Sequence, residues 1–467
     1  MPAIEKIFRA HSRRLQLVYD RMPSGVQNAL TAARGWSLAR NRYAPTMYAF
    51  LEELRSHEHW TREEVKAHQL RALQRVAEHA SKTVPFYAAL PPVELNSLED
   101  LAKFPVLARE QVRQAGDALL SKSVSDGECV RVGTTGTTGA SLKIAYSPRV
   151  AQRNWAFRMR QLGWMGIQPL SPRVTFFGSR VAPPQRTAPP YWTYNSPERQ
   201  LLMSSFHLSE KTAQDYIECL QRHSGEMLEG FPSVLGIMAD LILHRQTSVP
   251  MRAVFTDGEP LYPFLRAKIE KAFNARVYDT YGNTEICGLI QECEHNQMHL
   301  IPEFGYLEIL DEDNRPAPPG QEGYFVWTAL INDVMPLIRY RIGDRGCWQP
   351  EGQCLCGRAF PTVVPTITRD SDLLSCPDGR ILSPRTVNQL LKYSSSFRFC
   401  QFVQTGPERV IVRAVPSNGN SHRDLASVQE NLQKLLGTQM TVDTEVAPEP
   451  IVRAGGKIPL IVQKRAS

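Results

Sequence analysis

Apolar residues recur at helical spacing in the first part of the chain. Between residues 60 and 82, Trp60, Val65, Leu70 and Leu73 are separated by polar and charged residues. Apolar residues with this spacing lie on one face of an α-helix, which then packs against a core. Because proline rarely continues a helix, Pro85 limits the segment at its C-terminal end. We therefore predict an amphipathic helix over residues 60–82.

Further along, short apolar runs alternate with amphipathic stretches. The alternation predicts helices over 209–222, 233–246 and 261–273, and strands over 225–229, 251–255 and 275–279. Strands that alternate with helices form βαβ units, whose strands pair in parallel. Residues 181–200, rich in proline and polar residues, predict a long loop instead.

The last two parts of the chain have a different pattern. Apolar segments at 304–310, 323–330 and 337–341, separated by Asn, Asp and Pro turns, predict antiparallel strands. Beyond Arg369 the pattern changes again and predicts a small α+β module of about one hundred residues. Its expected helices cover 384–392 and 422–436, and its expected strands cover 399–404, 408–415 and 440–446.

These patterns predict an α/β protein with three parts. A basic helical extension covers residues 1–59. A large N-terminal domain with several subdomains covers 60–368, with mostly parallel sheets flanked by helices and an antiparallel β portion. A small, mobile α+β C-terminal domain covers 369–467. A chain of 467 residues is long enough to form two or three hydrophobic cores.

Composition narrows the class of protein. With 42% hydrophobic and 22% charged residues, the chain has the composition of a soluble globular protein. No apolar run approaches the roughly twenty residues that span a bilayer, and no signal-peptide core follows Met1. Nine cysteines, an odd number, argue against a disulfide framework and for a reducing compartment. We therefore expect a cytoplasmic protein.

The net charge of +7 is concentrated near the N-terminus. Residues 4–22 combine basic and apolar side chains and predict an amphipathic helix. Such a helix can make peripheral contact with an anionic membrane. The alternative, which we favour, is a solvated helix packed against the main domain. No motif supports a role with nucleic acid.

The segment over residues 132–143 is the first candidate for chemistry. It reads Val-Gly-Thr-Thr-Gly-Thr-Thr-Gly-Ala-Ser-Leu-Lys. Glycines allow tight turns whose backbone N–H groups form an anion-binding concavity, and hydroxyls and a lysine add donors. We expect these groups to bind ATP; the alternative is a surface turn. No Gly-Lys pair stands at P-loop spacing, so a P-loop NTPase is not indicated. The candidate ATP-binding residues are Thr134, Thr135, Gly136, Thr137, Thr138, Gly139 and Lys143.

Three further motifs follow in a fixed order. Residues 279–285 read Asp-Thr-Tyr-Gly-Asn-Thr-Glu, residues 339–344 read Arg-Tyr-Arg-Ile-Gly-Asp, and residues 453–459 read Arg-Ala-Gly-Gly-Lys-Ile-Pro. With the Gly/Thr segment, they make the chain resemble the adenylate-forming superfamily of acyl-CoA synthetases and ligases. More narrowly, it resembles the phenylacetate–CoA ligase and CapK-like branch. The resemblance runs from about Trp60 to the C-terminus.

The resemblance implies roles for the residues of these motifs. Glu285 would bind Mg²⁺ and Thr284 would contact the α-phosphate of ATP. Tyr281 would stack on adenine beside Gly282, and Asp344 would bind the ribose hydroxyls. The segment Gly258-Glu259-Pro260 would line the adenine side.

Two more candidates lie in the C-terminal part. The resemblance makes Lys457 the catalytic lysine that neutralises charge on the carboxylate and α-phosphate. It also implies a hinge at Thr368-Arg369-Asp370-Ser371-Asp372. That hinge keeps Arg369 and Asp372 but departs elsewhere from the usual Gly-Arg-x-Asp-Asp pattern. The departure puts the domain movement that accompanies acyl transfer in doubt.

A second constellation consists of cysteines and a histidine. Cys293 and His299 are followed by the close pair Cys354 and Cys356. Three thiolates and one imidazole make up a tetrahedral structural Zn²⁺ site. In relatives of the phenylacetate–CoA ligase type, matching positions belong to a structural metal site. His295 is an alternative nitrogen ligand, and reduced, partly buried cysteines without metal are the alternative interpretation.

We therefore expect ATP- and Mg²⁺-dependent activation of a carboxylic acid to an acyl-AMP, and we expect that acid to be an aryl or arylacetic acid. The acyl group would then pass to the thiol of CoA as co-substrate. The alternative acyl acceptor is an amine, a hydroxyl or a carrier-protein thiol. The assembly of the chain into a homodimer is left open. A non-catalytic nucleotide-binding scaffold is a further interpretation. A zinc hydrolase is disfavoured, because three Cys and one His leave no open metal position.

Overall fold

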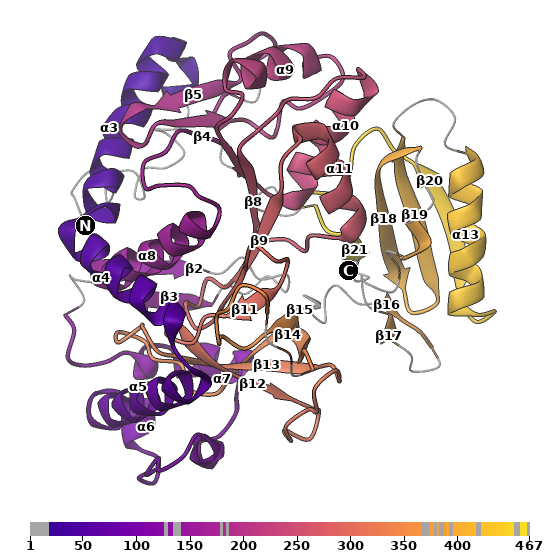
Figure 1. The fold of residues 1–467 in the computed structure, drawn as a ribbon. Helices are drawn as coiled ribbons and strands as arrows, with labels where there is room; N and C mark the ends of the chain where they lie inside the picture. Colours follow the sequence, from indigo (N-terminus) through magenta and orange to yellow (C-terminus); the bar gives the residue numbers. More distant parts are fainter. Residues whose placement is uncertain are drawn as a thin grey trace. The chain divides into compact units, whose positions relative to one another are not determined.

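The structure, a computed structural model, has a mixed α/β fold (Figure 1), as the sequence predicts. It describes residues 18–125, 129–133, 142–177, 181–183, 186–350, 352, 354–365, 374–377, 381–382, 387, 389–391, 396–416, 422–452 and 458–464. Two compact units are present. Unit 1 comprises Met1–Val174, Val181–Leu202 and Tyr278–Pro365, and unit 2 comprises Thr175–Arg180, Met203–Val277 and Thr366–Ser467. The expected domain boundaries after residues 59 and 368 stay predictions.

Helices come first in unit 1. The amphipathic helix expected over 60–82 is confirmed as α5. The Thr61 hydroxyl accepts a hydrogen bond from the Glu64 backbone, and the Glu64 carboxylate accepts one from the Thr61 backbone. This capping box satisfies two N–H groups that the first helical turn leaves unpaired. The helices of unit 1 are α3 (Ser24–Arg42), α4 (Pro45–Ser56), α5 (Arg62–Thr83), α6 (Pro85–Ala88), α7 (Arg109–Ala115) and α8 (Pro148–Trp164).

An antiparallel sheet confirms the strands expected over 304–310 and 323–330, but the third strand, expected over 337–341, lies at Tyr340–Trp348. Its order is β1-β14-β13-β12, with β15 also paired to β14. The strand β1 runs parallel to β14, and the other pairs are antiparallel. The strands are β1 (Leu107–Ala108), β12 (Gly305–Leu310), β13 (Gly323–Ala329), β14 (Tyr340–Trp348) and β15 (Val363–Pro365).

Two smaller strand groups complete this part of unit 1. The strands β9 (Val277–Gly282), β10 (Leu289–Glu292) and β11 (Met298–Leu300) pair in antiparallel order. The strands β2 (Val130–Gly133) and β3 (Lys143–Tyr146) form a hairpin. Aromatic rings fill the core between helices and sheet: Phe157 of α8 lies edge-on to Phe50 of α4 and to Phe304.

The structure corrects one expectation in unit 1. Residues 181–200 are not a continuous loop, because β5 (Trp192–Asn195), the short 3-10 helix η5 (Ser196–Glu198) and the start of β6 (Gln200–Met203) lie within or at the end of this range. The side chains of β5 alternate between more and less exposed positions, which is the period of a strand. Proline-rich flanks hide this short alternation in the sequence.

Unit 2 contains the expected alternation of strands and helices. The strands β7 (Met227–Gly230) and β8 (Ala253–Asp257) pair in parallel. The helices are α9 (Ala213–Arg222), α10 (Pro232–His244) and α11 (Pro263–Phe273), close to the predicted ranges. The last two helices approach closely at Gly236, where a Cβ atom would lie 2.6 Å from Leu265 Cδ2. The strand β4 (Arg173–Phe176) lies at the boundary of the two units.

The C-terminal part of unit 2 has a hydrophobic core of its own. Its sheet has the order β20-β19-β18-β21 and includes the strands expected after residue 369. The elements of this part are β18 (Phe397–Gly406), β19 (Arg409–Pro416), α13 (His422–Leu436), β20 (Thr441–Val446) and β21 (Ile461–Gln463). Before them in the chain, β16 (Leu374–Ser375) and β17 (Ile381–Leu382) form an antiparallel pair. Of the helix expected over 384–392, the described residues show Val387 in an α-helical position and the 3-10 helix η7 (Gln389–Leu391).

Within the residues that the structure describes, no helix combines the length and apolarity needed to cross a bilayer.

Candidate active site and metal centre

The predicted ATP-binding loop begins and ends on a hairpin. Gly133, the last residue of β2, pairs with Lys143, the first residue of β3. Lys143 is exposed to solvent at this position. The hairpin therefore brings the two ends of the loop together, as a loop that encloses a phosphate requires. The candidates Thr134, Thr135, Gly136, Thr137, Thr138 and Gly139 lie outside the described residues.

The end of β9 carries Tyr281, and its ring is deeply buried. The ring stacks on Trp327, with 6.2 Å between centroids, and meets the edge of Phe325. Its hydroxyl donates a hydrogen bond to Asp344 Oδ2 over 2.7 Å. Burial, followed by the negative charge of Asp344, raises the pKa of Tyr281 well above 10. The phenol therefore stays protonated and acts as a donor to the carboxylate that the motif predicts to bind ribose.

Glu285 follows four residues after Tyr281 and is 3% exposed. Its Oε1 atom accepts hydrogen bonds from the Tyr340 hydroxyl over 3.3 Å and from Arg109 Nη1 over 3.2 Å. Burial, followed by the charge of Glu285, raises the pKa of Tyr340. The arginine at the start of α7 supplies the positive charge that a buried carboxylate needs.

The two motifs are therefore joined crosswise within unit 1. In each motif a tyrosine precedes an acidic residue by four positions: Tyr281 before Glu285, and Tyr340 before Asp344. Each tyrosine donates its hydroxyl to the carboxylate of the other motif. Two carboxylates are thus held in fixed positions, and the exposed Thr284 lies directly beside one of them in the chain.

A tight turn over residues 283–288 positions Glu285. Ile286 has a φ of 54°, a conformation that branched residues rarely adopt. The Asn283 side-chain oxygen accepts hydrogen bonds from the backbone N–H groups of Cys287 and Gly288. These bonds close the turn, and they explain why an asparagine follows Gly282.

A third predicted segment lies in unit 2. Gly258, at φ 78°, follows β8 in a conformation that favours glycine. Next to it, Glu259 Oε2 accepts a hydrogen bond from the Ser233 backbone N–H over 3.1 Å. Its Oε1 accepts one from the Ile458 backbone N–H over 3.0 Å. One carboxylate therefore connects the Gly258-Glu259-Pro260 segment, the start of α10 and the residue that follows Lys457. Lys457 itself and Arg369, with the rest of the predicted hinge, lie outside the described residues.

The four predicted zinc ligands lie together in unit 1. The ligand atoms of Cys293, His299, Cys354 and Cys356 all lie within 4.8 Å of one another. The sulfur atoms of Cys293 and Cys354 lie 3.6 Å apart, and the sulfur of Cys356 lies 3.4 Å from His299 Nε2. Around a tetrahedral Zn²⁺, these distances would be about 3.8 Å and about 3.6 Å. The donor set and its spacing therefore fit zinc.

The surroundings of the cluster prepare it for a cation. His299 Nδ1 is 2.9 Å from the Phe360 carbonyl oxygen, so that Nδ1–H donates and Nε2 faces the sulfurs. Burial raises the pKa of the Cys356 thiol, but its hydrogen bond with His299 and one from the Arg358 backbone outweigh this effect and lower it to about 6. A thiolate is the form that binds a metal. Zinc itself stays a prediction.

Several partners were not found from the sequence. Arg109 and Tyr340 contact Glu285 across separations of 176 and 55 residues, and no local pattern marks either contact. Arg358, next to the cysteine pair, bonds with Glu58 and Glu294. Only its position in a Cys-Leu-Cys-Gly-Arg run signals that it belongs to the metal region.

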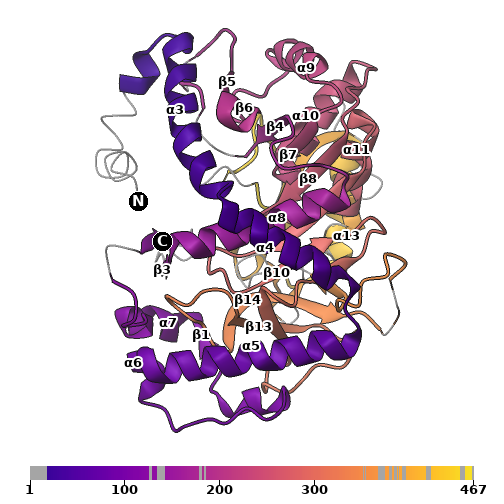
Figure 2. The ribbon, with the colours of Figure 1, turned by 60° about the vertical axis from the view of Figure 1, so that its left-hand side comes forward.

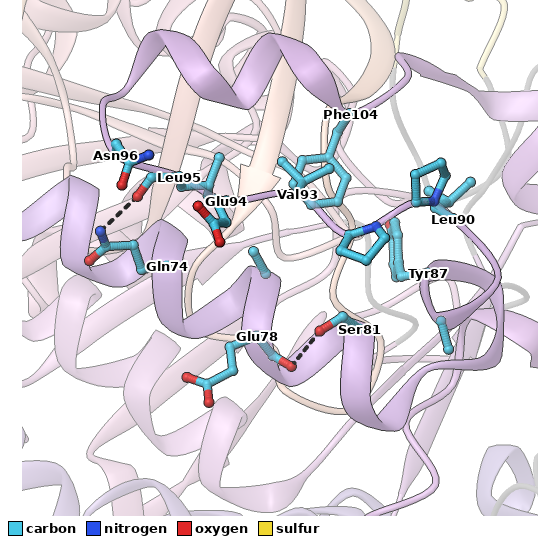
Figure 3. A pocket seen from close by; sticks show the side chains of 14 residues that line it. Gln74, Glu78, Ser81, Tyr87, Leu90, Val93, Glu94, Leu95, Asn96 and Phe104 are labelled. Carbon is cyan, nitrogen blue, oxygen red and sulfur yellow. Dashed lines mark hydrogen bonds between the residues drawn. The ribbon is translucent and has the colours of Figure 1, made fainter.

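A cavity of about 500 Å³ lies elsewhere in unit 1 (Figure 3). It is lined by residues of α5, α6 and the segment that follows, and Gln74 donates a hydrogen bond to the Leu95 carbonyl at one side. None of the predicted site residues lines it. Its charged lining residues, Glu78 and Glu94, are both acidic. Acidic groups repel carboxylates and phosphates, so this cavity does not fit the expected substrates.

Known proteins resemble the chain over most of its length. A family model for the AMP-binding enzyme family matches residues 199–328. Protein CapK of Staphylococcus aureus is 22% identical over 95% of this chain and 98% of its own length. A phenylacetate–coenzyme A ligase of Thermus thermophilus is 25% identical over 67% of this chain and 72% of its own length.

Solved structures resemble the fold. A 2-hydroxyisobutyryl-CoA ligase, crystallised in the postadenylation state with an acyl-AMP, superposes with a TM-score of 0.68. The alignment covers 87% of this chain and 91% of that structure, at 21% sequence identity. This likeness establishes the fold.

Proposed function

We propose that this chain, which belongs to the adenylate-forming enzymes of the CapK and phenylacetate–CoA ligase branch, converts a carboxylic acid to an acyl-AMP and then to a thioester of CoA. The crosswise pairing of Tyr281 with Asp344 and of Tyr340 with Glu285 is the observation that carries this proposal. It fixes the positions of the two carboxylates that we propose as the ribose ligand, Asp344, and the Mg²⁺ ligand, Glu285. The matched AMP-binding region and the curated ligases support the same reaction.

In the first step, a carboxylate oxygen of the acid attacks the α-phosphorus of ATP. The bond from the α-phosphorus to the bridging oxygen breaks, and pyrophosphate leaves with the electron pair. Lys457 neutralises the charge that develops between the carboxylate and the α-phosphate, and Thr284 donates its hydroxyl to that phosphate. Lys143 and the backbone of residues 134–139 bind the leaving phosphates.

In the second step, the thiolate sulfur of CoA attacks the acyl carbon, and AMP leaves. The hinge around Arg369 would permit the change between the two steps. Glu259 is proposed to hold the lysine-bearing segment during adenylation, because it binds the backbone of Ile458.

Two metals fit the residues of the chain. Glu285 offers a buried carboxylate oxygen, the kind of ligand that Mg²⁺ prefers. When bound, Mg²⁺ neutralises phosphate charge. The four-residue Cys/His cluster would hold Zn²⁺ for structure, since its four donors leave no open position for chemistry.

We propose an aryl or arylacetic acid as the substrate, supported by the phenylacetate–CoA ligases among the relatives. The residues that would select it lie in segments 201–208, 231–233, 256–260 and 282–290. An acceptor other than CoA is the second candidate, because the similarity to CapK extends over 95% of the chain, beyond the part shared with the ligases. That acceptor would be an amine, a hydroxyl or a carrier-protein thiol.

The test is ATP–pyrophosphate exchange with Mg²⁺ and a panel of aryl, arylacetic, fatty and amino acids. Exchange that depends on one class of acid supports adenylation, and adding CoA, amines or carrier protein then identifies the acceptor. Glu285→Gln should reduce exchange more than about 100-fold, because a bound metal supplies several kcal/mol of charge stabilisation. Glu218→Gln, at an exposed position of α9, is the matched control. If the protein binds ATP but exchanges with no acid, the scaffold interpretation replaces this proposal.

A further inference from the structure

The helix α3 is packed with its polar side inward. Gln27 is fully buried and Gly35 is buried, while Val26, Leu30 and Trp36 are 43%, 38% and 61% exposed. A helix on the surface of a globular protein normally shows the opposite arrangement, with an apolar stripe against the core. The outward face of α3 therefore has no role in the hydrophobic core of unit 1.

Polar contacts hold the inward face in place. Gln27 Nε2 donates to the Tyr19 carbonyl over 2.9 Å, and Arg186 Nη2 donates to Gln27 Oε1 over 2.9 Å. Near the end of the helix, Arg42 forms an ion pair with the buried Glu198. At Gly35 a Cβ atom would overlap the Asn195 side chain, so the helix lies directly against β5 (Figure 2). These specific contacts fix which side of α3 faces outward.

The outward apolar residues form one continuous stripe. At 100° per residue, they fall within an arc of about 120° that runs along the helix. A stripe of this width is typical of a helix face that packs against an apolar phase. Its members, all exposed, are Val26, Ala29, Leu30, Ala33 and Trp36.

The charge around the stripe has one sign. The helix contains no Asp or Glu between Ser24 and Arg42. Arg34 and Arg40 are exposed, and the Arg40 guanidinium lies 5.6 Å from the centre of the Trp36 ring. At 100° per residue, Arg34 lies beside the stripe, and Arg40 lies on the same face as the stripe, one turn beyond Trp36. Apolar residues, an exposed tryptophan and exposed arginines together are the features of helices that lie in the interface of an anionic membrane.

A second copy of the chain fits this face less well. A helix of nineteen residues is about 28 Å long and about 10 Å wide, so it offers about 300 Å². A stable protein interface needs about 800 Å² on each partner. Two copies related by a two-fold axis would also bring the cationic flanks together, and like charges repel.

We propose that α3 binds an anionic lipid surface in the plane of the interface. Trp36 and Leu30 enter the boundary between headgroups and acyl chains, and Arg34 and Arg40 contact lipid phosphates. The protein would then act on its substrate beside a membrane. This inference goes beyond the proposed function and does not depend on it.

Vesicle sedimentation of the full-length protein tests the proposal. We expect binding to vesicles that contain phosphatidylglycerol, weaker binding to pure phosphatidylcholine, and a decrease as salt screens the charges. Arg34→Gln with Arg40→Gln should weaken binding about 30-fold, or about fivefold for each arginine near the surface. Leu30→Gln with Trp36→Gln should reduce binding by more than tenfold, given the loss of apolar contact.

Val446→Gln, at an exposed position of β20, is the matched control and should bind as the unaltered protein does. Circular dichroism would verify that each variant keeps its fold. The proposal is overturned if the α3 variants bind vesicles as tightly as the unaltered protein, or if no vesicle is bound. It is also overturned if light scattering shows a dimer that Leu30→Gln with Trp36→Gln dissociates, because a second copy would then cover the stripe.

Discussion

Breaking the buried ion pair between Arg160 and Glu303 should strongly destabilise unit 1. Glu303 Oε1 accepts a hydrogen bond from Arg160 Nη1 over 2.7 Å, and Oε2 accepts one from Nη2 over 3.3 Å. His57 Nδ1 lies 3.2 Å from the same Oε1. Both side chains of the pair are almost fully buried. We predict that Glu303→Gln destabilises the protein by about 3–5 kcal/mol, because it leaves the arginine charge buried and uncompensated.

The lowered pKa of Glu303 reflects the same interaction with Arg160. Burial raises this pKa, but the charge and hydrogen bonds of Arg160, with the hydrogen bond from His57, lower it from 4.5 to about 2. The difference corresponds to about 3 kcal/mol. Because the folded pKa is depressed, the stabilisation is present above pH 4.5 and is lost as the pH falls toward 2. Between about pH 7 and about pH 4, about 1 kcal/mol of this stabilisation should be lost.

The assay is urea unfolding followed by circular dichroism, for the unaltered protein and Glu303→Gln, at both pH values. The variant should unfold at a lower urea concentration, and the gap should narrow at the lower pH. Glu218→Gln, an exposed acid-to-amide change, should alter the free energy of unfolding by less than about 0.5 kcal/mol. A cost below about 1 kcal/mol for Glu303→Gln would refute the reasoning, because it would mean that solvent reaches the pair.

A double variant separates charge from packing. Arg160→Met with Glu303→Gln removes the uncompensated charge, so it should be more stable than Glu303→Gln alone. The Arg160 guanidinium also lies 5.2 Å from the centre of the Phe360 ring, and the Phe360 carbonyl accepts the hydrogen bond from His299. Loss of the pair should therefore also loosen the candidate zinc site.

Three further predictions concern the candidate sites. Tyr281→Phe removes the hydroxyl that donates a hydrogen bond to Asp344. Because a hydrogen bond to a charged group is worth about 1.5–3 kcal/mol, the KM for ATP should rise tenfold or more. An unchanged KM would exclude a role for this pair in nucleotide binding. Cys356→Ser should lose bound zinc in a metal analysis of purified protein, while the buried Cys219→Ser keeps it; zinc-free unaltered protein would contradict the metal assignment. Glu259→Ala leaves the backbone N–H groups of Ser233 and Ile458 without their acceptor. The kcat for pyrophosphate exchange should therefore fall, with little change in the KM for ATP. A normal kcat would contradict a positioning role for Glu259.

Much of the fold and the list of candidate residues could be predicted from the sequence, because the signals are local. The helix α5 follows from the periodicity after Trp60 and from Pro85 at its end, whereas the capping box of Thr61 and Glu64 that fixes its start emerged only from the structure. The order of the motifs identifies Glu285 and Asp344 as functional candidates. The spacing of the cysteines and histidine predicts a metal site, and the structure brings its four ligand atoms together.

The tertiary structure decides which distant groups meet. Arg109 and Tyr340 reach Glu285 from other elements, and no spacing in the sequence signals either contact. It also decides that β5 forms where composition predicts a loop, and that α3 turns Gln27 inward and Trp36 outward. Helical periodicity shows that a helix has two faces, but the face that becomes buried depends on the partners available across the fold. For α3, the polar partners of Gln27 and the buried Glu198 that pairs with Arg42 determine that choice.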